Sequence, residues 1–161
     1  MSIVLDGTNA SSFSGGITKP SLPTGSVLQV VNATYSTSTV SSSSTQAATG
    51  LTATITPTSA TSKILVFVSQ SGLAKETTDT SVGLWLYRNA TSIVNFEVKA
   101  AYTGTTAANR VGGASTTYLD SPATTSAVTY STKFNSNSNS ASVYVQINDA
   151  TSTITLMEIA A

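Results

Sequence analysis

The chain has 161 residues, enough for one domain with an apolar core, and its seven Lys or Arg residues balance seven Asp or Glu residues. Without a block of like charge, the sequence argues against a nucleic-acid partner or an anionic membrane. It contains no His and no Cys, which excludes Ser-His and Cys-His hydrolases, disulfides, and metal sites built from imidazole or thiolate.

Serine and threonine are unusually frequent, with 27 Ser and 29 Thr among the 161 residues. Threonine is β-branched and suits the solvent-facing side of a strand, whereas serine is common in turns. Apolar residues still make up 40% of the chain. This composition predicts a sheet-rich protein whose lightly charged, hydroxyl-rich surface associates with other subunits.

Residues 1–24 are predicted to form an extended arm, because several Gly and Pro residues prevent a long element. The arm has one apolar run, Ile3, Val4 and Leu5. We expect these residues to contact another subunit by adding an edge strand, which needs only main-chain hydrogen bonds. The alternative is that the arm folds back on its own domain.

The N-terminus has no basic region ahead of this short apolar run, so no secretory signal is visible. No stretch of eighteen apolar residues occurs anywhere in the chain, and no membrane insertion is expected. We therefore expect synthesis in a cytoplasm.

The predicted globular domain covers residues 25–161 and begins with a long strand within residues 26–37. Residues 38–49 are of low complexity and are expected to form a loop or a ragged edge strand. In the next strand, Leu51, Ala53 and Ile55 alternate with threonines, the pattern of a strand with one wet face, and Pro57 ends it.

Residues 64–68, ILVFV, are apolar on both faces, as in a strand covered on both sides. Such a strand lies either inside a sandwich or along a subunit contact. Leu65 and Phe67, which point away from Val66, are therefore candidates for that contact.

Two polar stretches are predicted to be loops. Residues 71–81 are the most charged part of the chain and include Lys75, Glu76 and Asp79, so a solvated loop is expected there. Residues 102–115 are rich in Gly, Ala and Thr and include Tyr102 and Arg110. These five residues are our candidates for loops that recognise a partner.

Residues 81–100 read as a hairpin with a turn at 88–91. Trp85 and Tyr87 sit at alternating positions beside apolar neighbours, and we assign them to core or subunit packing. An alternative is that the aromatic residues build a platform for stacking a sugar, with Tyr102, Tyr118, Tyr130 and Tyr144 as the other members.

Further strands are expected at residues 116–120, 128–134, 143–147 and 153–160. The total is eight to ten strands with no helical crossover between them. This pattern predicts an all-β fold, an antiparallel β-sandwich closed as a jelly roll.

Carboxylates on or beside strands are the remaining source of chemistry. A glycosidase-like pair among Glu97, Asp120 and Glu158 is one interpretation. We prefer structural roles, with Glu97 paired to Lys99 on the same strand face and Glu158 at the rim near the terminus. The aspartates in turns lack the spacing of a calcium loop, so no metal is expected there. Because the carboxylates have structural roles and His and Cys are absent, we also expect no enzymatic activity and no cofactor.

Three stretches, GSVLQVVNATYST from Gly25, GLTATITPTSATSKILVFVSQ from Gly50 and GLWLYRNATSI from Gly83, together with the closing ITLMEI, resemble a β-domain of tailed-phage structural proteins. This family is frequent in phages of aquatic bacteria, in tail fibres and on capsid surfaces. The resemblance covers about residues 25–159. It implies a jelly-roll-like sandwich that assembles as a homotrimer on the virion surface.

Two roles follow from the resemblance. As a capsid decoration (cement) protein, a trimer would bind the outer face of the phage head, and its arms would lie over the major capsid protein. As a tail-fibre or appendage tip, it would bind a host receptor or glycan through the two predicted loops. We expect the first role, because a short arm and not an extended fibre shaft precedes the domain, and we keep the second as the alternative.

Overall fold

The computed structural model describes residues 22–138 and 141–161. Within these residues the chain forms ten strands and one short 3-10 turn, η2 (Ile147–Asp149). The strands are β1 (Val27–Tyr35), β2 (Thr39–Ser41), β3 (Ala47–Ile55), β4 (Lys63–Glu76), β5 (Thr80–Arg88), β6 (Thr91–Thr103), β7 (Ala108–Asp120), β8 (Val128–Ser136), β9 (Val143–Val145) and β10 (Ser152–Ile159).

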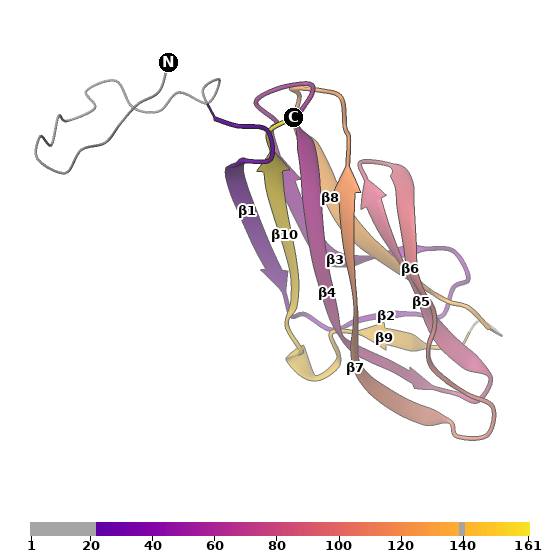
Figure 1. The fold of residues 1–161 in the computed structure, drawn as a ribbon. Coiled ribbons are helices and arrows are strands. Elements are labelled where there is room, and N and C mark those ends of the chain that lie inside the picture. The colour runs from indigo at the N-terminus through magenta and orange to yellow at the C-terminus, as the bar shows by residue number, and fades with distance from the viewer. Residues whose placement is uncertain (1–21, 139–140) are drawn as a thin grey trace, which may run out of the picture.

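The strands form two antiparallel sheets packed face to face (Figure 1). In sheet A, β4 is the central strand, with β10 and then β1 along one edge and β7 along the other. The short β9 pairs with the far end of β4 on the same edge as β10, and β2 pairs with β9. Sheet B has the order β3-β8-β5-β6. Without β2 and β9, the orders β1-β10-β4-β7 and β3-β8-β5-β6 are those of an eight-stranded jelly roll. The predicted all-β sandwich is confirmed.

The core forms because inward residues of both sheets alternate with outward ones. In β4, Ile64, Val66 and Val68 are buried, whereas Leu65 is half-buried and Phe67 is exposed. In β3, the predicted alternation is confirmed, since Leu51, Ala53 and Ile55 are buried and the intervening threonines face outward. The strand at 64–68 therefore has one core face and one outer face. Burial of both faces inside the sandwich is wrong, and the alternative, that the outer face lies along a subunit contact, stays a prediction.

A belt of buried polar side chains separates the apolar core into two clusters. Gln70 donates to Ser152 Oγ at 3.0 Å and accepts from Thr132 Oγ1 at 2.9 Å. Thr132 is in turn hydrogen bonded to Thr49, and Gln146 donates to the same Ser152 hydroxyl. Because these groups bond to one another in a low-dielectric interior, the belt fixes the two sheets in one relative position.

The two predicted loops are wrong over most of their length. β4 continues past Gln70 to Glu76, and β7 begins at Ala108 instead of Thr116. The reason is tertiary: β4 and β7 pair continuously from Ile64–Asp120 to Glu76–Ala108. Gly113 fits this pairing because a side chain there would meet the Gln70 carbonyl oxygen at 2.4 Å.

The sandwich has two distinct ends. At one end the domain begins and finishes, with Gly25 N donating to Ala160 O at 2.8 Å and Ala160 N to Ser26 O at 2.9 Å. At the other end lie the β4–β5 turn, residues 77–79, and the β6–β7 turn, residues 104–107 (Figure 1). We call these the terminal end and the distal end.

Candidate functional site

The distal end brings together the five residues predicted to lie on recognition loops. Lys75 and Glu76 close β4, Asp79 lies in the β4–β5 turn, Tyr102 is near the end of β6, and Arg110 is near the start of β7. They therefore lie at one end of the molecule, but most of them stand on strands rather than on the predicted loops.

Lys75 differs most from its prediction, because it is fully buried. Its ammonium donates to the carbonyl oxygens of Thr77 at 3.0 Å, Thr103 at 2.9 Å and Thr106 at 2.8 Å. We call these three acceptors the carbonyl cluster. Thr77 and Thr106 lie in the two distal turns and Thr103 ends β6, so a single buried cation joins the two turns.

Asp79 and Tyr102 form the second contact between the turns. The Tyr102 hydroxyl donates to Asp79 Oδ1 at 3.1 Å, and Asp79 N donates to the Thr103 carbonyl at 3.1 Å. The hydrogen bond to Asp79, the negative charge of that carboxylate and a small desolvation raise the pKa of the Tyr102 hydroxyl above its ordinary value. Tyr102 nevertheless remains 45% exposed.

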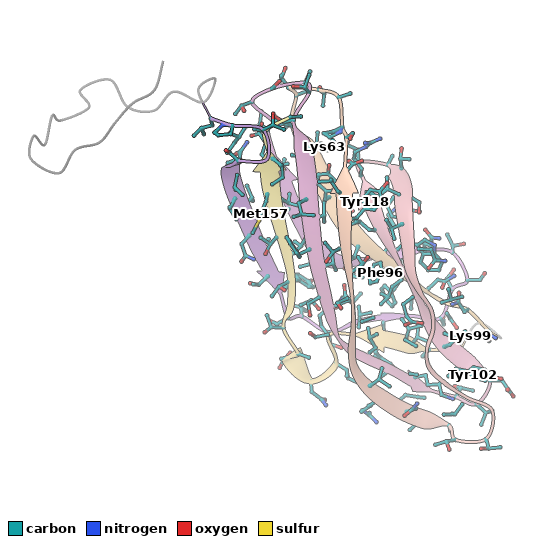
Figure 2. All side chains as sticks on the ribbon, viewed as in Figure 1. Lys63, Phe96, Lys99, Tyr102, Tyr118 and Met157 are labelled. Atoms are coloured by element: carbon teal, nitrogen blue, oxygen red, sulfur yellow. The ribbon has the colours of Figure 1, made fainter. Side chains whose placement is uncertain are left out.

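Two cations complete the surface of the distal end. Arg110 Nη2 lies 2.9 Å from Glu76 Oε1 in an exposed ion pair. The Lys99 ammonium lies 5.4 Å from the centre of the Tyr102 ring, and both side chains stand together at this end in Figure 2. Contacts of this kind stabilise exposed groups only slightly, but they orient them.

The outer face of sheet A bears an apolar row that crosses all four long strands. The register places Val30 beside Met157, Met157 beside Leu65, and Leu65 beside Leu119. Phe67 lies in the next row and is 39% exposed. Around them the face bears mostly Thr, Ser and Asn, with the exposed Lys63 two residues from Leu65 on β4, so the row is an exposed apolar strip on a lightly charged surface.

The four candidates for the subunit contact divide between opposite outer faces. Leu65 and Phe67 belong to sheet A, whereas Trp85 and Tyr87 belong to sheet B. Tyr87 donates to Gln46 and lies 4.0 Å beneath the Lys133 ammonium, which half-buries its ring. The structure therefore does not unite these four residues in one patch.

The carboxylates proposed as a catalytic pair have structural partners. Asp120 binds Arg88 at 2.9 Å and accepts from the Tyr130 hydroxyl at 2.6 Å. Burial, followed by that hydrogen bond, raises the pKa of Tyr130 far above its ordinary value. The predicted Glu97–Lys99 ion pair is wrong: Glu97 instead accepts from the main-chain N–H groups of Val98 and Lys99.

Glu158 is fully buried at the terminal end, which corrects its predicted position at the rim. Its carboxylate accepts from Gln29 Nε2 at 2.6 Å and from the main-chain N and the hydroxyl of Thr58 at 2.7 Å each. Burial raises the pKa of Glu158, but these hydrogen bonds and one from Ser62 outweigh it, so the net pKa is lowered.

A cavity of about 360 Å³ lies at the terminal end, lined by Leu22, Leu28, Thr58 and Ala160 among others. The arm residues Ile3, Val4 and Leu5 lie outside the described residues. Among residues 22–138 and 141–161, no group of three His, Cys, Asp or Glu side chains could hold a metal ion. No helix in this part of the chain is long and apolar enough to span a membrane.

Sequence reasoning missed two features of the distal end, the buried ammonium of Lys75 and the left-handed backbone of Ala101, which has φ 62°. Neither has a local signal, because each depends on segments brought together by the fold. No protein-family model matches the sequence, and no curated protein matches it. Functional inference therefore depends on the surfaces described above.

Proposed function

We propose that this protein is a structural component of a phage virion, of the capsid decoration (cement) type. A trimer of the β-domain would bind the outer face of the head, and the N-terminal arms would contact the major capsid protein. Its action is contact alone, through buried apolar area and added main-chain hydrogen bonds. The observation that supports this role best is the apolar row on the outer face of sheet A.

The apolar row supports assembly because it would remain in water in a monomer. Val30 and Leu119 are 55% and 50% exposed, and they lie at the two ends of a continuous row that includes Met157 and Leu65. Burying such side chains contributes about 25 cal/mol for each Å² removed from water. We assign the row to the contact between subunits, with Leu65 in the middle of the row and Phe67 beside it.

The role within the particle is tested by locating the protein in it. Electron microscopy of intact virions, with quantification of copy number, should find many copies spread over the head. A few copies confined to the tail would contradict the decoration role and favour the alternative.

The subunit contact is tested with Leu65→Asp, which places a charge in the apolar row without touching the core. We expect a folded monomer where the wild type is a trimer, measured by light scattering after size-exclusion chromatography. Asn95→Asp, which adds the same charge at an exposed position of β6 in sheet B, should leave the trimer intact. An unchanged trimer in Leu65→Asp would exclude this face as the contact.

A second candidate function is a tail-fibre or appendage tip that binds a host receptor or glycan. The observation in its favour is the position of the predicted recognition residues. They lie at the distal end, opposite to the end where Gly25 and Ala160 are hydrogen bonded. A domain tethered at its terminal end would present Asp79, Tyr102 and Arg110 outward, above the buried Lys75.

A further inference from the structure

We propose that Tyr102, Asp79 and Lys99 form a binding site for a neutral sugar at the distal end. This inference deepens the second candidate function and rests on it only for the biological source of the sugar. The site is made of an exposed aromatic ring, a carboxylate fixed beside it and the Lys99 ammonium, which lies over the ring at 5.4 Å from its centre. A stacked sugar would use the ring face opposite to Lys99.

Tyr102 is the aromatic residue that remains available for stacking. It is 45% exposed, whereas Trp85, Tyr87, Tyr118 and Tyr144 are half-buried and Tyr130 is fully buried. The face of an aromatic ring is weakly negative, so it attracts the polarised C–H groups of a pyranose. Of the six aromatic residues considered for a sugar platform, the structure therefore leaves Tyr102.

Asp79 supplies the polar partner that a stacked sugar requires. Its Oδ1 accepts from the Tyr102 hydroxyl at 3.1 Å, which fixes the carboxylate next to the ring. An ionised carboxylate has two oxygens and accepts several hydrogen bonds. The second oxygen can accept from a hydroxyl of a sugar lying on the ring, which would give the site orientation as well as contact area.

The backbone beneath the site is held in an uncommon conformation at two non-glycine residues. Asp79 has φ 55° and Ala101 has φ 62°. The pairing of β5 with β6 shifts register between Thr80–Thr103 and Val82–Ala100, so Ala101 and Tyr102 form a bulge. Bulges commonly redirect a side chain, and left-handed non-glycine residues concentrate at functional sites. Here the bulge accompanies the exposure of Tyr102.

Lys75 acts as a positioning residue for the site. Its ammonium binds the Thr103 carbonyl, which follows Tyr102, and the Thr77 carbonyl, which precedes Asp79 by two residues. The turns that hold the ring and the carboxylate are thus joined before any ligand arrives. Such preorganisation lowers the entropic cost of binding.

The charges of this surface point to a neutral ligand. Glu76 and Arg110 neutralise each other at 2.9 Å, and the Asp79 carboxylate is matched by the Lys99 ammonium near the same ring. A strongly anionic or cationic ligand would meet no excess of opposite charge among the exposed groups. A hydroxyl-rich, uncharged sugar fits both the ring and the carboxylate.

The test is saturation-transfer NMR with the full chain and five neutral probes: the methyl pyranosides of glucose, galactose, mannose, rhamnose and N-acetylglucosamine, each at ~10 mM, since a single exposed ring gives affinity of order mM. We expect transfer to at least one probe. Tyr102→Ala and Asp79→Asn should each reduce it at least fivefold, and Tyr102→Phe should retain more of it than Tyr102→Ala. Asparagine tolerates the left-handed backbone at position 79.

Val98→Ala is the matched control, because Val98 is 54% exposed on the same strand but lies outside the proposed site. It should leave transfer unchanged. Transfer to none of the five probes, or transfer that survives Tyr102→Ala, would overturn the proposal. Neither result depends on where the protein lies in the virion. The sugar site and the virion role can therefore fail separately.

Discussion

The two ends of the sandwich each contain a fully buried charge, and they stabilise it in opposite ways. At the terminal end the Glu158 carboxylate is held by N–H and O–H donors of Gln29 and Thr58. At the distal end the Lys75 ammonium is held by three main-chain carbonyls. Neither charge has an ionic partner among these contacts, so each depends on polar groups that the fold brings together.

The difference lies in what the two charges organise. The partners of Glu158 come from β1 and from the β3–β4 turn, so the carboxylate joins β10 to the framework of the sandwich. The partners of Lys75 are the carbonyls of two turns. The comparison indicates that the terminal charge maintains the fold, whereas the distal charge maintains the shape of a surface.

The largest expected effect is at Glu158. Glu158→Ala removes the acceptor of three partly buried hydrogen bonds and should lower the free energy of unfolding by about 2 kcal/mol, measured by urea titration. Glu158→Gln keeps the shape and one acceptor oxygen and should lower it by about half as much. A loss below ~0.5 kcal/mol in the alanine variant would show that the terminal charge does not maintain the fold.

A smaller, local effect is expected at Lys75. Lys75→Met removes the donor to the carbonyl cluster, and the two turns can reach water, so the global loss should be about 1 kcal/mol. Amide hydrogen exchange should accelerate in residues 77–79 and 104–107 but not in β10. Lys63→Met, at an exposed lysine near the terminal end (Figure 2), is the control. Equal protection of the turns in both variants would contradict the role of Lys75.

The smallest effect is expected from pH between about 5 and 9, because the chain has no His and no Cys. The lowered pKa of Glu158 stabilises the fold above its unfolded value near 4.5, and this contribution is lost as the pH falls through the folded pKa. The raised pKa of Tyr130 acts in the other direction, with stability lost as the pH rises above about 10.

The free energies of unfolding from urea titrations at pH 5, 7 and 9 should therefore agree within ~0.5 kcal/mol. Below pH 4.5 the wild type should lose stability more steeply than Glu158→Gln, whose side chain does not titrate. If the free energy of unfolding falls equally steeply below pH 4.5 in both proteins, the acid sensitivity comes from other carboxylates.

The sequence predicted the framework well where one strand face is apolar and the other bears hydroxyls. Leu51, Ala53 and Ile55 lie in the core as their alternation indicated. The same reasoning failed in the second half of β4 and the first half of β7, because Ser71, Gly72, Gly112 and Gly113 resemble loop residues. There the strand conformation is imposed by pairing between distant segments, which no local pattern reveals.

Two members of the candidate site, Asp79 and Tyr102, were among the residues predicted for recognition, whereas Lys99 was assigned to an ion pair with Glu97, and the arrangement was not predicted. Asp79, Tyr102 and Arg110 were identified from polar, glycine-rich stretches, and they do lie at one end of the molecule. The burial of Lys75 could not be predicted, since two of its three partners are 28 and 31 residues away in the sequence. Charge in a sequence marks a residue that needs polar partners, and only the fold decides whether those partners are water.

The hydrogen bonds between Gly25 or Ser26 and Ala160 also have a consequence for protein engineering. The two ends of the domain are about one strand spacing apart, ~5 Å. A segment with adjacent ends can be inserted into a surface loop of another protein with little distortion of its host. The β-domain would then act as a rigid spacer, and any peptide grafted onto the β6–β7 turn would be displayed at its far end.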